Sequence, residues 1–205
     1  MIKFEPIIKW SGSKRHQVND LIKHFPINID TYYEPFIGGG SMMRALTETP
    51  QIHVNHIVCS DINNDLINTW NSIKEQPNDL YEHYVSLWNE LNKDDNKGRR
   101  RDYFNEVRAR YNKEHNPFDF FFIMRTTTNG MPRYNSKGDF NNSFHITRNG
   151  ITPLLLKPIV FEWSQKLNER NVEFLCRSYE DVSCTENDFI YKKHVRKMRG
   201  LQPRI

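Results

Sequence analysis

The sequence predicts an α/β protein built on a doubly wound sheet, and three observations support this. Residues 31–36 have the pattern of a strand, the triple glycine Gly38–Gly40 comes shortly after it, and the next residues have the pattern of a helix. A second predicted strand ends at Asp61 and leads into another helix. Strands that alternate with helices in this way are typical of a sheet with helices on its faces.

The size and composition of the chain indicate a globular protein. Its 205 residues allow one domain with an inserted lobe and a proper core. Hydrophobic residues make up 37% of the chain, which argues against disorder. The net charge of +4 is only a weak indication of a polyanionic partner. No apolar run of about 18 residues and no signal peptide is found, so we expect no membrane span and a location in the cytosol.

The cysteines predict neither disulfides nor a metal site. Cys59, Cys176 and Cys184 are odd in number, scattered, and in no CxxC spacing. This argues against both a disulfide framework and a structural zinc site.

The elements of the first half follow from spacing and turn residues. Helical spacing from His16 onward predicts a first helix, and residues 31–36 form a strand candidate. Ser41 is a good N-cap for the helix after the glycines. Residues 56–61 read as the second strand, followed by a turn at Asn63 and Asn64 and a further helix.

The second half is mainly helical and then returns to strands. Residues 78–115 look helical and polar, with one break at 93–101. Residues 131–145 resemble a hairpin, with its turn at Ser136–Gly138. A helix over 154–169 is expected to be interrupted near Pro158. Residues 172–176 and 187–191 are strand candidates.

The glycine loop and the acid that follows it suggest a nucleoside site. Gly38 and Gly40 lie between a strand and a helix, where glycine permits positive φ and close approach of a ligand. Asp61 follows Gly38 by 23 positions, and a carboxylate there can accept the hydroxyls of a ribose. For the glycines alone, a tight turn is an equally good explanation. The lack of a GxGxxG pattern argues against NAD and favours a ligand with little phosphate, such as S-adenosylmethionine.

A second clue lies in the N-terminal segment "KWSGSK". Lys9, Trp10 and Lys14 surround a turn of small residues. The tryptophan suits either an adenine or a hydrophobic core. Taken alone, each of these residues is better explained by packing.

Together these segments resemble the Dam-type (D12 class) adenine-specific DNA N6-methyltransferases. The resemblance covers residues 7–191 and rests on five motifs in the family's order. These are "KWSGSK", "EPFIGGGS", "SDIN", "NGMPRYNSKGDFN" and "NDFIY". Each motif is weak by itself, whereas the ordered set is specific.

The resemblance implies a fold and a domain organisation. Residues 1–76 and 145–191 would form a Rossmann-like sheet that binds S-adenosylmethionine. Residues 77–144 would form an inserted, mainly helical lobe that recognises double-stranded DNA. Residues 192–205 would remain as an atypical basic tail. The implied location is the cytoplasm of a bacterial or phage-infected cell, and the implied context includes restriction–modification.

The resemblance also implies site residues. Trp10 and Lys14 would contact S-adenosylmethionine, Phe36 and the Gly38–Gly40 loop would line its pocket, and Asp61 would hold the ribose. On the DNA side, the set implied to contact bases or phosphates, or to enter the groove, is Lys9, Asn129, Arg133 and Asn135. Arginine suits this role because its fork matches guanine O6 and N7.

Some features near the expected DNA lobe leave alternatives open. The basic run at 97–101, with Arg108, Arg110 and Lys113, either neutralises phosphates or forms a solvated helix face. Ser13 replaces a glycine of the family pattern, and Thr128 stands where relatives often carry an aromatic residue. The segment "NNSFH" is also unusual. The recognition sequence, for which GATC is the family favourite, is therefore not predicted.

The catalytic Asp-Pro-Pro-Tyr motif of the family is missing. It would follow the strand that ends at Tyr191, but "KKHVRK" stands there, and no Asp-Pro-Pro occurs in the chain. No catalytic residue is therefore assigned. We expect an incomplete sheet and a truncated methyltransferase that is inactive alone, with a complementing C-terminal fragment as a candidate partner. A DNA-binding module without chemistry is the alternative, and a small-molecule methyltransferase is disfavoured because the Arg133 hairpin would be unexplained.

The last fourteen residues are unusual in charge. Residues 192–205 carry six positive charges and no acid, so the remaining residues have a net charge of −2. They show no periodic apolar face. We expect an end without fixed structure rather than a basic arm that binds nucleic acid.

Overall fold

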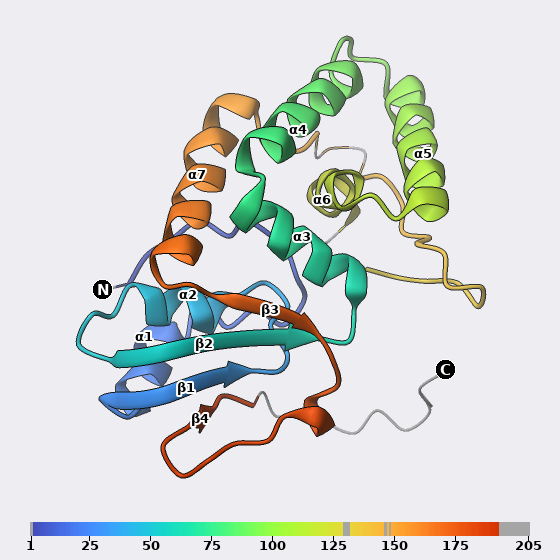
Figure 1. The fold of residues 1–205 in the computed structure, drawn as a ribbon. Helices are drawn as coiled ribbons and strands as arrows, with labels where there is room; N and C mark the ends of the chain where they lie inside the picture. The colour runs from blue at the N-terminus through green and yellow to red at the C-terminus, as the bar shows by residue number, and fades with distance from the viewer. Residues whose placement is uncertain (1, 129–131, 146, 148, 193–205) are drawn as a thin grey trace.

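A four-stranded parallel sheet forms the base of the molecule (Figure 1). The computed structural model describes residues 2–128, 132–145, 147 and 149–192. The strands lie in the order β3-β2-β1-β4 and run in parallel. Their bounds are Asn28–Glu34 for β1, His53–Asp61 for β2, Glu173–Cys176 for β3 and Phe189–Ile190 for β4.

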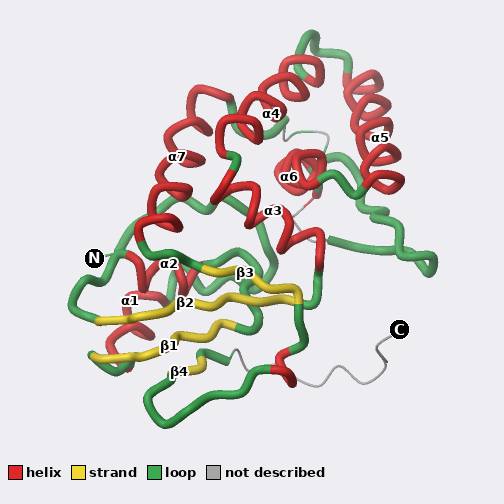
Figure 2. Tube along the Cα trace, in the orientation of Figure 1, coloured by secondary structure: helices red, strands yellow, loops and turns green. Residues whose placement is uncertain are grey.

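Seven α-helices accompany the sheet in the described part of the chain (Figure 2). Two short 3-10 helices cover Ile22–His24 and Tyr179–Asp181. The α-helices are α1 (Val18–Leu21), α2 (Ser41–Thr47), α3 (Asn64–Glu75), α4 (Pro77–Leu91), α5 (Lys97–Glu114), α6 (Pro117–Thr126) and α7 (Pro153–Glu169). The prediction of an α/β fold is confirmed. None of the helices in the described residues is long and apolar enough to cross a membrane.

The core is continuous from the sheet into the helices. The central strands supply side chains to the core, among them Ile29 and Tyr32 of β1 and Ile57 and Cys59 of β2. Trp70 of α3 is fully buried and contacts the rings of Trp163 and Phe174, each with ring centroids 5.4 Å apart. This aromatic cluster joins α3, α7 and β3, and so holds the helix that follows β2 in place.

Helices α4 to α6 pack on α3 and α7 and on one another, away from the strand edges (Figure 1). Helix α6 is apolar nearly all round, and its Phe120, Phe121 and Phe122 are all buried. The one carboxylate in its first turns, Asp119, is also buried and is bound by Arg110 of α5 at 2.6 and 2.7 Å and by His83 of α4 at 2.7 Å. Burial alone would raise the pKa of Asp119, but the hydrogen bonds from these two partners lower it below its ordinary value. His83 and Arg110 thus connect α4 and α5 to α6 through Asp119.

The expected hairpin is confirmed. Tyr134 and Phe140 pair in antiparallel fashion, and Gly138 has φ +90° in the turn between them. The Asn135 side-chain oxygen accepts hydrogen bonds from the backbone amides of Lys137 and Asp139. This is the local bonding by which asparagine favours turns.

Three predicted features differ from the structure. Ser41, expected to be the N-cap of the helix after the glycines, is the first residue of α2, and Gly40 occupies the N-cap position. The strand expected at 31–36 begins earlier, at Asn28, and ends at Glu34, because Pro35 has no amide to donate to a ladder. The predicted interruption near Pro158 is wrong, since α7 runs through this residue. Proline there leaves one carbonyl of the first turns without its helical donor, and the buried side chains Leu156, Val160 and Trp163 hold the helix on the core.

Candidate functional site

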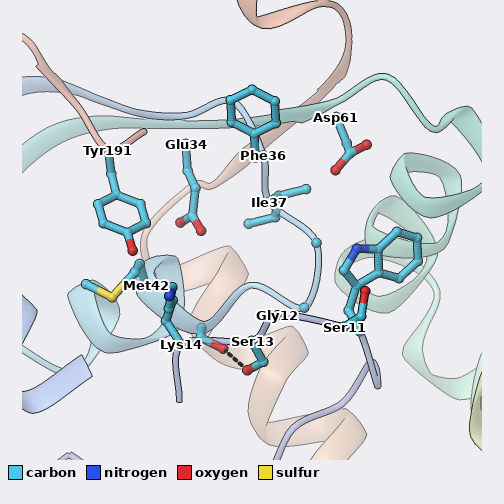
Figure 3. A pocket seen from close by; sticks show the side chains of 14 residues that line it. Ser11, Gly12, Ser13, Lys14, Glu34, Phe36, Ile37, Met42, Asp61 and Tyr191 are labelled. Atoms are coloured by element: carbon cyan, nitrogen blue, oxygen red, sulfur yellow. Dashed lines mark hydrogen bonds between the residues drawn. The ribbon is translucent and has the colours of Figure 1, made fainter. Parts of the chain in front are cut away.

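A pocket lies where the carboxyl ends of three neighbouring strands meet. Asp61 ends β2, Glu34 ends β1, and Tyr191 follows β4, and all three line the pocket. Figure 3 shows Asp61 and Tyr191 at opposite ends of the pocket, with Glu34 beside Tyr191. From β1 the chain adds β2 and β3 on one side of the sheet and then β4 on the other side, so the strand order reverses at β1. Ligands of open α/β sheets bind at such a switch point.

The glycine loop forms the floor between β1 and α2. Its turn is closed by a hydrogen bond of 2.8 Å from the Gly40 amide to the Ile37 carbonyl. The Ile37 amide donates to the Ser60 carbonyl of β2 at 3.0 Å, and the Trp70 indole donates to the Gly38 carbonyl at 3.0 Å. Gly38 has φ +46°. The loop is therefore fixed to both β2 and α3 and presents a preformed backbone surface.

Gly40 shapes the loop but does not line the pocket. It has φ +65°, and a Cβ atom there would lie 2.9 Å from two ring carbons of Trp70. We expect Gly40→Ala to destabilise the fold by about 2–4 kcal/mol, from the left-handed backbone and from overpacking. Urea denaturation measures this change in the free energy of unfolding.

Gly138→Ala is the matched control for Gly40→Ala. Gly138 also has positive φ, but a Cβ atom there meets nothing within 4 Å. Gly138→Ala should lower the free energy of unfolding by about 1–2 kcal/mol, the cost of the left-handed backbone alone. Equal losses at the two positions would contradict the role of the Trp70 contact.

The N-terminal turn closes the opposite side of the pocket. Trp10, Lys14 and the turn Ser11–Ser13 all line it, and the Ser13 hydroxyl is 2.7 Å from that of Ser41 at the start of α2 (Figure 3). A Cβ atom on Gly38 would lie 2.7 Å from the Trp10 ring, so the indole rests directly on the glycine loop. Trp10 is only partly buried and packs against the core as well. Packing and pocket lining are thus combined in one residue.

Asp61 is a partly buried carboxylate that is bound by backbone amides. Burial raises the pKa of Asp61, and hydrogen bonds from the backbone amides of Asn63, Gly38 and Ile62 partly offset the rise. The Asn63 amide lies 3.1 Å from Oδ1. A partly desolvated carboxylate with acceptor capacity left is well suited to bind hydroxyl groups.

Glu34 was not singled out from the sequence as a site residue. It is 4% exposed, and its Oε2 accepts hydrogen bonds from the Tyr32 hydroxyl at 2.9 Å and the Met43 amide at 2.8 Å. Burial, with the Glu34 charge as a further cause, raises the pKa of both Tyr32 and Tyr191. The signal for Glu34 was its position, since it ends the first strand as Asp61 ends the second.

Five of the six residues predicted to bind the cofactor share this pocket, and Gly40 lies behind it. Further lining residues not assigned from the sequence include Ile37, Met42 and Tyr191. Tyr191 is brought to the site by the pairing of β4 with β1, where its amide donates to the Tyr33 carbonyl at 2.9 Å. The five predicted residues that line the pocket are Trp10, Lys14, Phe36, Gly38 and Asp61.

The residues predicted to contact DNA occupy two places. Lys9 lines a hollow next to Arg125 of α6 and Asn149. Arg133 and Asn135 lie exposed on the hairpin. The Asn135 side chain is used within the turn, where its amide also donates to Asp139 at 3.0 Å. Asn129 lies outside the described residues, as do residues 193–205 of the basic tail.

The basic run of α5 is largely engaged within the molecule. Arg99 donates to the Leu91 carbonyl, Arg100 pairs with Asp95 at 3.0 Å, and Arg108 donates to the Asn142 carbonyl at 2.9 Å. Arg110 is committed to Asp119. The exposed members of the run are Lys97, Arg101 and Lys113, together with Arg110 despite its bond to Asp119. Most of these arginines therefore stabilise the helical part of the structure.

Metal-ligating side chains do not cluster in the described residues. No group of three or more His, Cys, Asp or Glu side chains is arranged there to hold an ion. The polar groups of the pocket are two carboxylates, one ammonium and hydroxyls. Such a set suits an organic ligand with hydroxyl and charged groups.

Known proteins resemble this chain over nearly all of its length. It is 29% identical to the Type II methyltransferase M.MjaIII of Methanocaldococcus jannaschii, across 93% of this chain and 68% of that protein. It is 29% identical to the DNA adenine methylase of Serratia marcescens, across 89% of this chain and 62% of that protein. For the DNA adenine methylase of Escherichia coli K12 the identity is 27%, across 92% and 63%. The chain thus spans about two thirds of the length of these relatives.

The match to a family as a whole is broader than any single motif. The family described as D12 class N6 adenine-specific DNA methyltransferase matches residues 10–192. This range includes the glycine loop, Asp61, the hairpin and β4. The chain therefore belongs to the D12 class of N6 adenine-specific DNA methyltransferases.

Proposed function

We propose that the pocket at the glycine loop binds S-adenosylmethionine, and that the chain is the cofactor-binding and DNA-reading part of an adenine methyltransferase. The observation that carries this proposal is the convergence of Asp61, Glu34 and the glycine loop at one edge of the sheet. In this reading residues 1–76 and 145–191 are the Rossmann-like methyltransferase domain, and residues 77–144 are the lobe that recognises DNA.

The donor and acceptor groups of the pocket fit this cofactor. Asp61 would accept the two ribose hydroxyls, in the manner of acids that follow the second strand of nucleoside-binding folds. Trp10, Phe36 and Ile37 supply apolar surface for an adenine ring. The loop has no GxGxxG pattern, so it is not built for a pyrophosphate.

The charges of the pocket also fit. S-adenosylmethionine carries an ammonium, a sulfonium and a carboxylate, so its net charge is positive. Two carboxylates, Glu34 and Asp61, and one ammonium, that of Lys14, line the pocket. Lys14 is partly buried and would pair with the ligand carboxylate. Glu34, at the Tyr191 end, would favour the cationic groups.

We infer that the hairpin and the N-terminal Lys9 face DNA. Arg133 is exposed on the first arm of the hairpin, and its backbone carbonyl accepts the Asn141 amide at 2.9 Å, which fixes the arm. An arginine presented in this way suits the O6 and N7 acceptors of guanine. Asn135 would act by shaping the turn, and Asn129 is included on the family resemblance alone.

The transfer step needs groups that the pocket does not contain. Bound S-adenosylmethionine would supply the methyl group, and the adenine must be flipped out of the duplex to receive it. In the family an Asp-Pro-Pro-Tyr motif positions the adenine N6, and no Asp-Pro-Pro occurs in this sequence. We therefore propose that residues 1–205 bind the cofactor and by themselves transfer no methyl group.

A methyl-transfer assay tests the proposal. The chain is incubated with S-adenosylmethionine labelled in its methyl group and with DNA of mixed sequence, and label in DNA is counted. We expect cofactor to be retained by the protein and no label above background in the DNA. Robust methyl transfer by the chain alone would contradict the proposal that it is inactive. The groups that position the base would then lie elsewhere in this sequence.

The absence of Asp-Pro-Pro also favours a second function, that of a DNA-binding module without chemistry. A gel-shift titration against salt separates site-specific DNA binding from purely electrostatic DNA binding. Site-specific binding persists in competitor DNA, whereas binding through exposed cations alone falls steeply as salt rises. Steep loss of all binding would contradict the module.

A further inference from the structure

We propose that Asn63 and Tyr134 couple the cofactor pocket to the DNA hairpin, so that a ligand on Asp61 stabilises the hairpin of residues 132–145. The inference rests on the proposed function, since it requires that a cofactor engage Asp61. It deepens that function by assigning a positioning role to two residues that are in direct contact. Neither residue lines the pocket.

Asn63 connects the pocket to the hairpin because three of its polar groups bind three different residues. Its backbone amide donates to Asp61 Oδ1 at 3.1 Å. Its side-chain oxygen caps α3 by accepting the Leu66 amide at 3.0 Å. Its side-chain amide donates to the Tyr134 hydroxyl at 3.0 Å. One residue therefore contacts the expected ribose acceptor, a helix start and the hairpin.

Tyr134 extends the connection into the helical part. It interacts electrostatically with Tyr111 of α5. The Tyr111 hydroxyl donates a hydrogen bond to Asp65 of α3 at 2.5 Å. Tyr134 therefore stands next to a contact that joins α5 to the start of α3.

The hairpin is held at this point and on its other arm. The Tyr134 ring meets the buried Phe140 ring edge to face, with centroids 5.9 Å apart. Phe140 is fixed to α5 by two backbone hydrogen bonds with the Asn112 side chain, at 2.9 and 3.0 Å. Figure 1 shows an arm of the hairpin running toward the start of α3 while its tip projects away from the helices. The Asn63 contact is thus the direct tie between the hairpin and the strand that carries Asp61.

This geometry gives a physical route for coupling. A ligand whose hydroxyls bind the Asp61 carboxylate fixes the carboxylate, and with it the Asn63 amide that donates to Oδ1. Asn63 then holds the Tyr134 hydroxyl more firmly. Because Tyr134 is 39% exposed, water competes for this bond when Asn63 moves. Coupling of two sites through a shared element is reciprocal, so DNA on the hairpin would tighten the cofactor by the same factor.

Hydrogen exchange on the full chain tests this inference. S-adenosylhomocysteine serves as the ligand because it does not react, and the amides followed are those of Asn135, Gly138 and Asn141, which are bonded within the hairpin. In the wild type we expect the ligand to slow their exchange about five-fold, the factor that one net hydrogen bond is worth. In Tyr134→Phe, which keeps the ring and removes the hydroxyl, the ligand should have no effect on these amides.

Two further variants make the result specific. Asn63→Ser keeps a good helix cap and the backbone amide but removes the donor to Tyr134, so it should abolish the ligand effect as well. Tyr81→Phe is the matched control, since its hydroxyl bonds to the Pro153 carbonyl within the helical part. It should respond to the ligand as the wild type does. A merely structural role for Tyr134 would speed exchange equally with and without ligand.

The outcomes separate this inference from the function on which it rests. If the wild type binds the ligand and Tyr134→Phe retains the full slowing of exchange, or if the wild-type hairpin shows none, the coupling is wrong and the cofactor site stands. If the wild type binds no S-adenosylhomocysteine, both proposals fall. By reciprocity, the Kd of Tyr134→Phe for the ligand should rise by no more than about five-fold.

Discussion

Replacement of Asp61 by asparagine is expected to weaken S-adenosylhomocysteine binding about 10- to 100-fold. The amide keeps one acceptor for the Asn63 backbone but loses the charge and the second acceptor for a ribose. Hydrogen bonds to charged groups contribute about 1.5–3 kcal/mol each, which corresponds to this range. Equilibrium dialysis of the labelled ligand against the full chain measures the change.

Asp30→Asn is the matched control for this substitution. Asp30 lies on the same sheet at the opposite end of β1, is exposed, and accepts a hydrogen bond from Asn55 at 2.9 Å. Its replacement should leave the affinity unchanged. If Asp61→Asn bound the ligand as tightly as the wild type, the carboxylate would not hold the ribose and the pocket would have to bind its ligand differently.

Trp70→Ala is expected to destabilise the fold by about 3–5 kcal/mol, the range for deletion of a large buried aromatic side chain. The indole is fully buried against Trp163 and Phe174, and its N–H donates to the Gly38 carbonyl. Urea denaturation of the two proteins gives the difference in the free energy of unfolding.

Trp70→Phe separates the packing of this residue from its hydrogen bond. The smaller ring retains much of the contact, and the lost N–H leaves the buried Gly38 carbonyl without its indole donor. We expect a loss of about 1–3 kcal/mol together with weaker cofactor binding, because the glycine loop is then held less firmly. A Trp70→Phe variant with wild-type stability and affinity would show that the bond to Gly38 does not support the loop.

The local parts of the site could be predicted from the sequence, because they depend on neighbours along the chain. Gly38 and Asp61 stand at strand ends, and residue type and spacing alone indicate their position. Five of the six predicted cofactor residues consequently line one pocket. The turn of the hairpin was equally predictable, since asparagine and glycine determine it locally.

The remaining parts depend on how distant segments pair. Tyr191 reaches the pocket only because β4 lies beside β1, a neighbour relation that the sequence of β4 does not encode locally. The role of Arg110 also depends on a distant segment. Its place in a basic run suggests a surface charge, whereas in the structure it binds Asp119 on the next helix. The helix continues through Pro158 because burial of one helix face outweighs a single lost hydrogen bond.

The contact between Asn63 and Tyr134 is a further example. The two residues are 71 positions apart, and asparagine at 63 has an adequate local explanation as a helix cap. The sequence therefore gives no reason to look for a second partner. Only the folded hairpin brings the Tyr134 hydroxyl within reach of the side-chain amide.

Isothermal titration of the 205-residue chain with S-adenosylhomocysteine shows whether the pocket is a cofactor site for S-adenosylmethionine. We expect saturable binding at one site per chain, undiminished by an excess of NAD. Absence of heat and of binding by dialysis, or displacement of the ligand by NAD, would contradict this expectation.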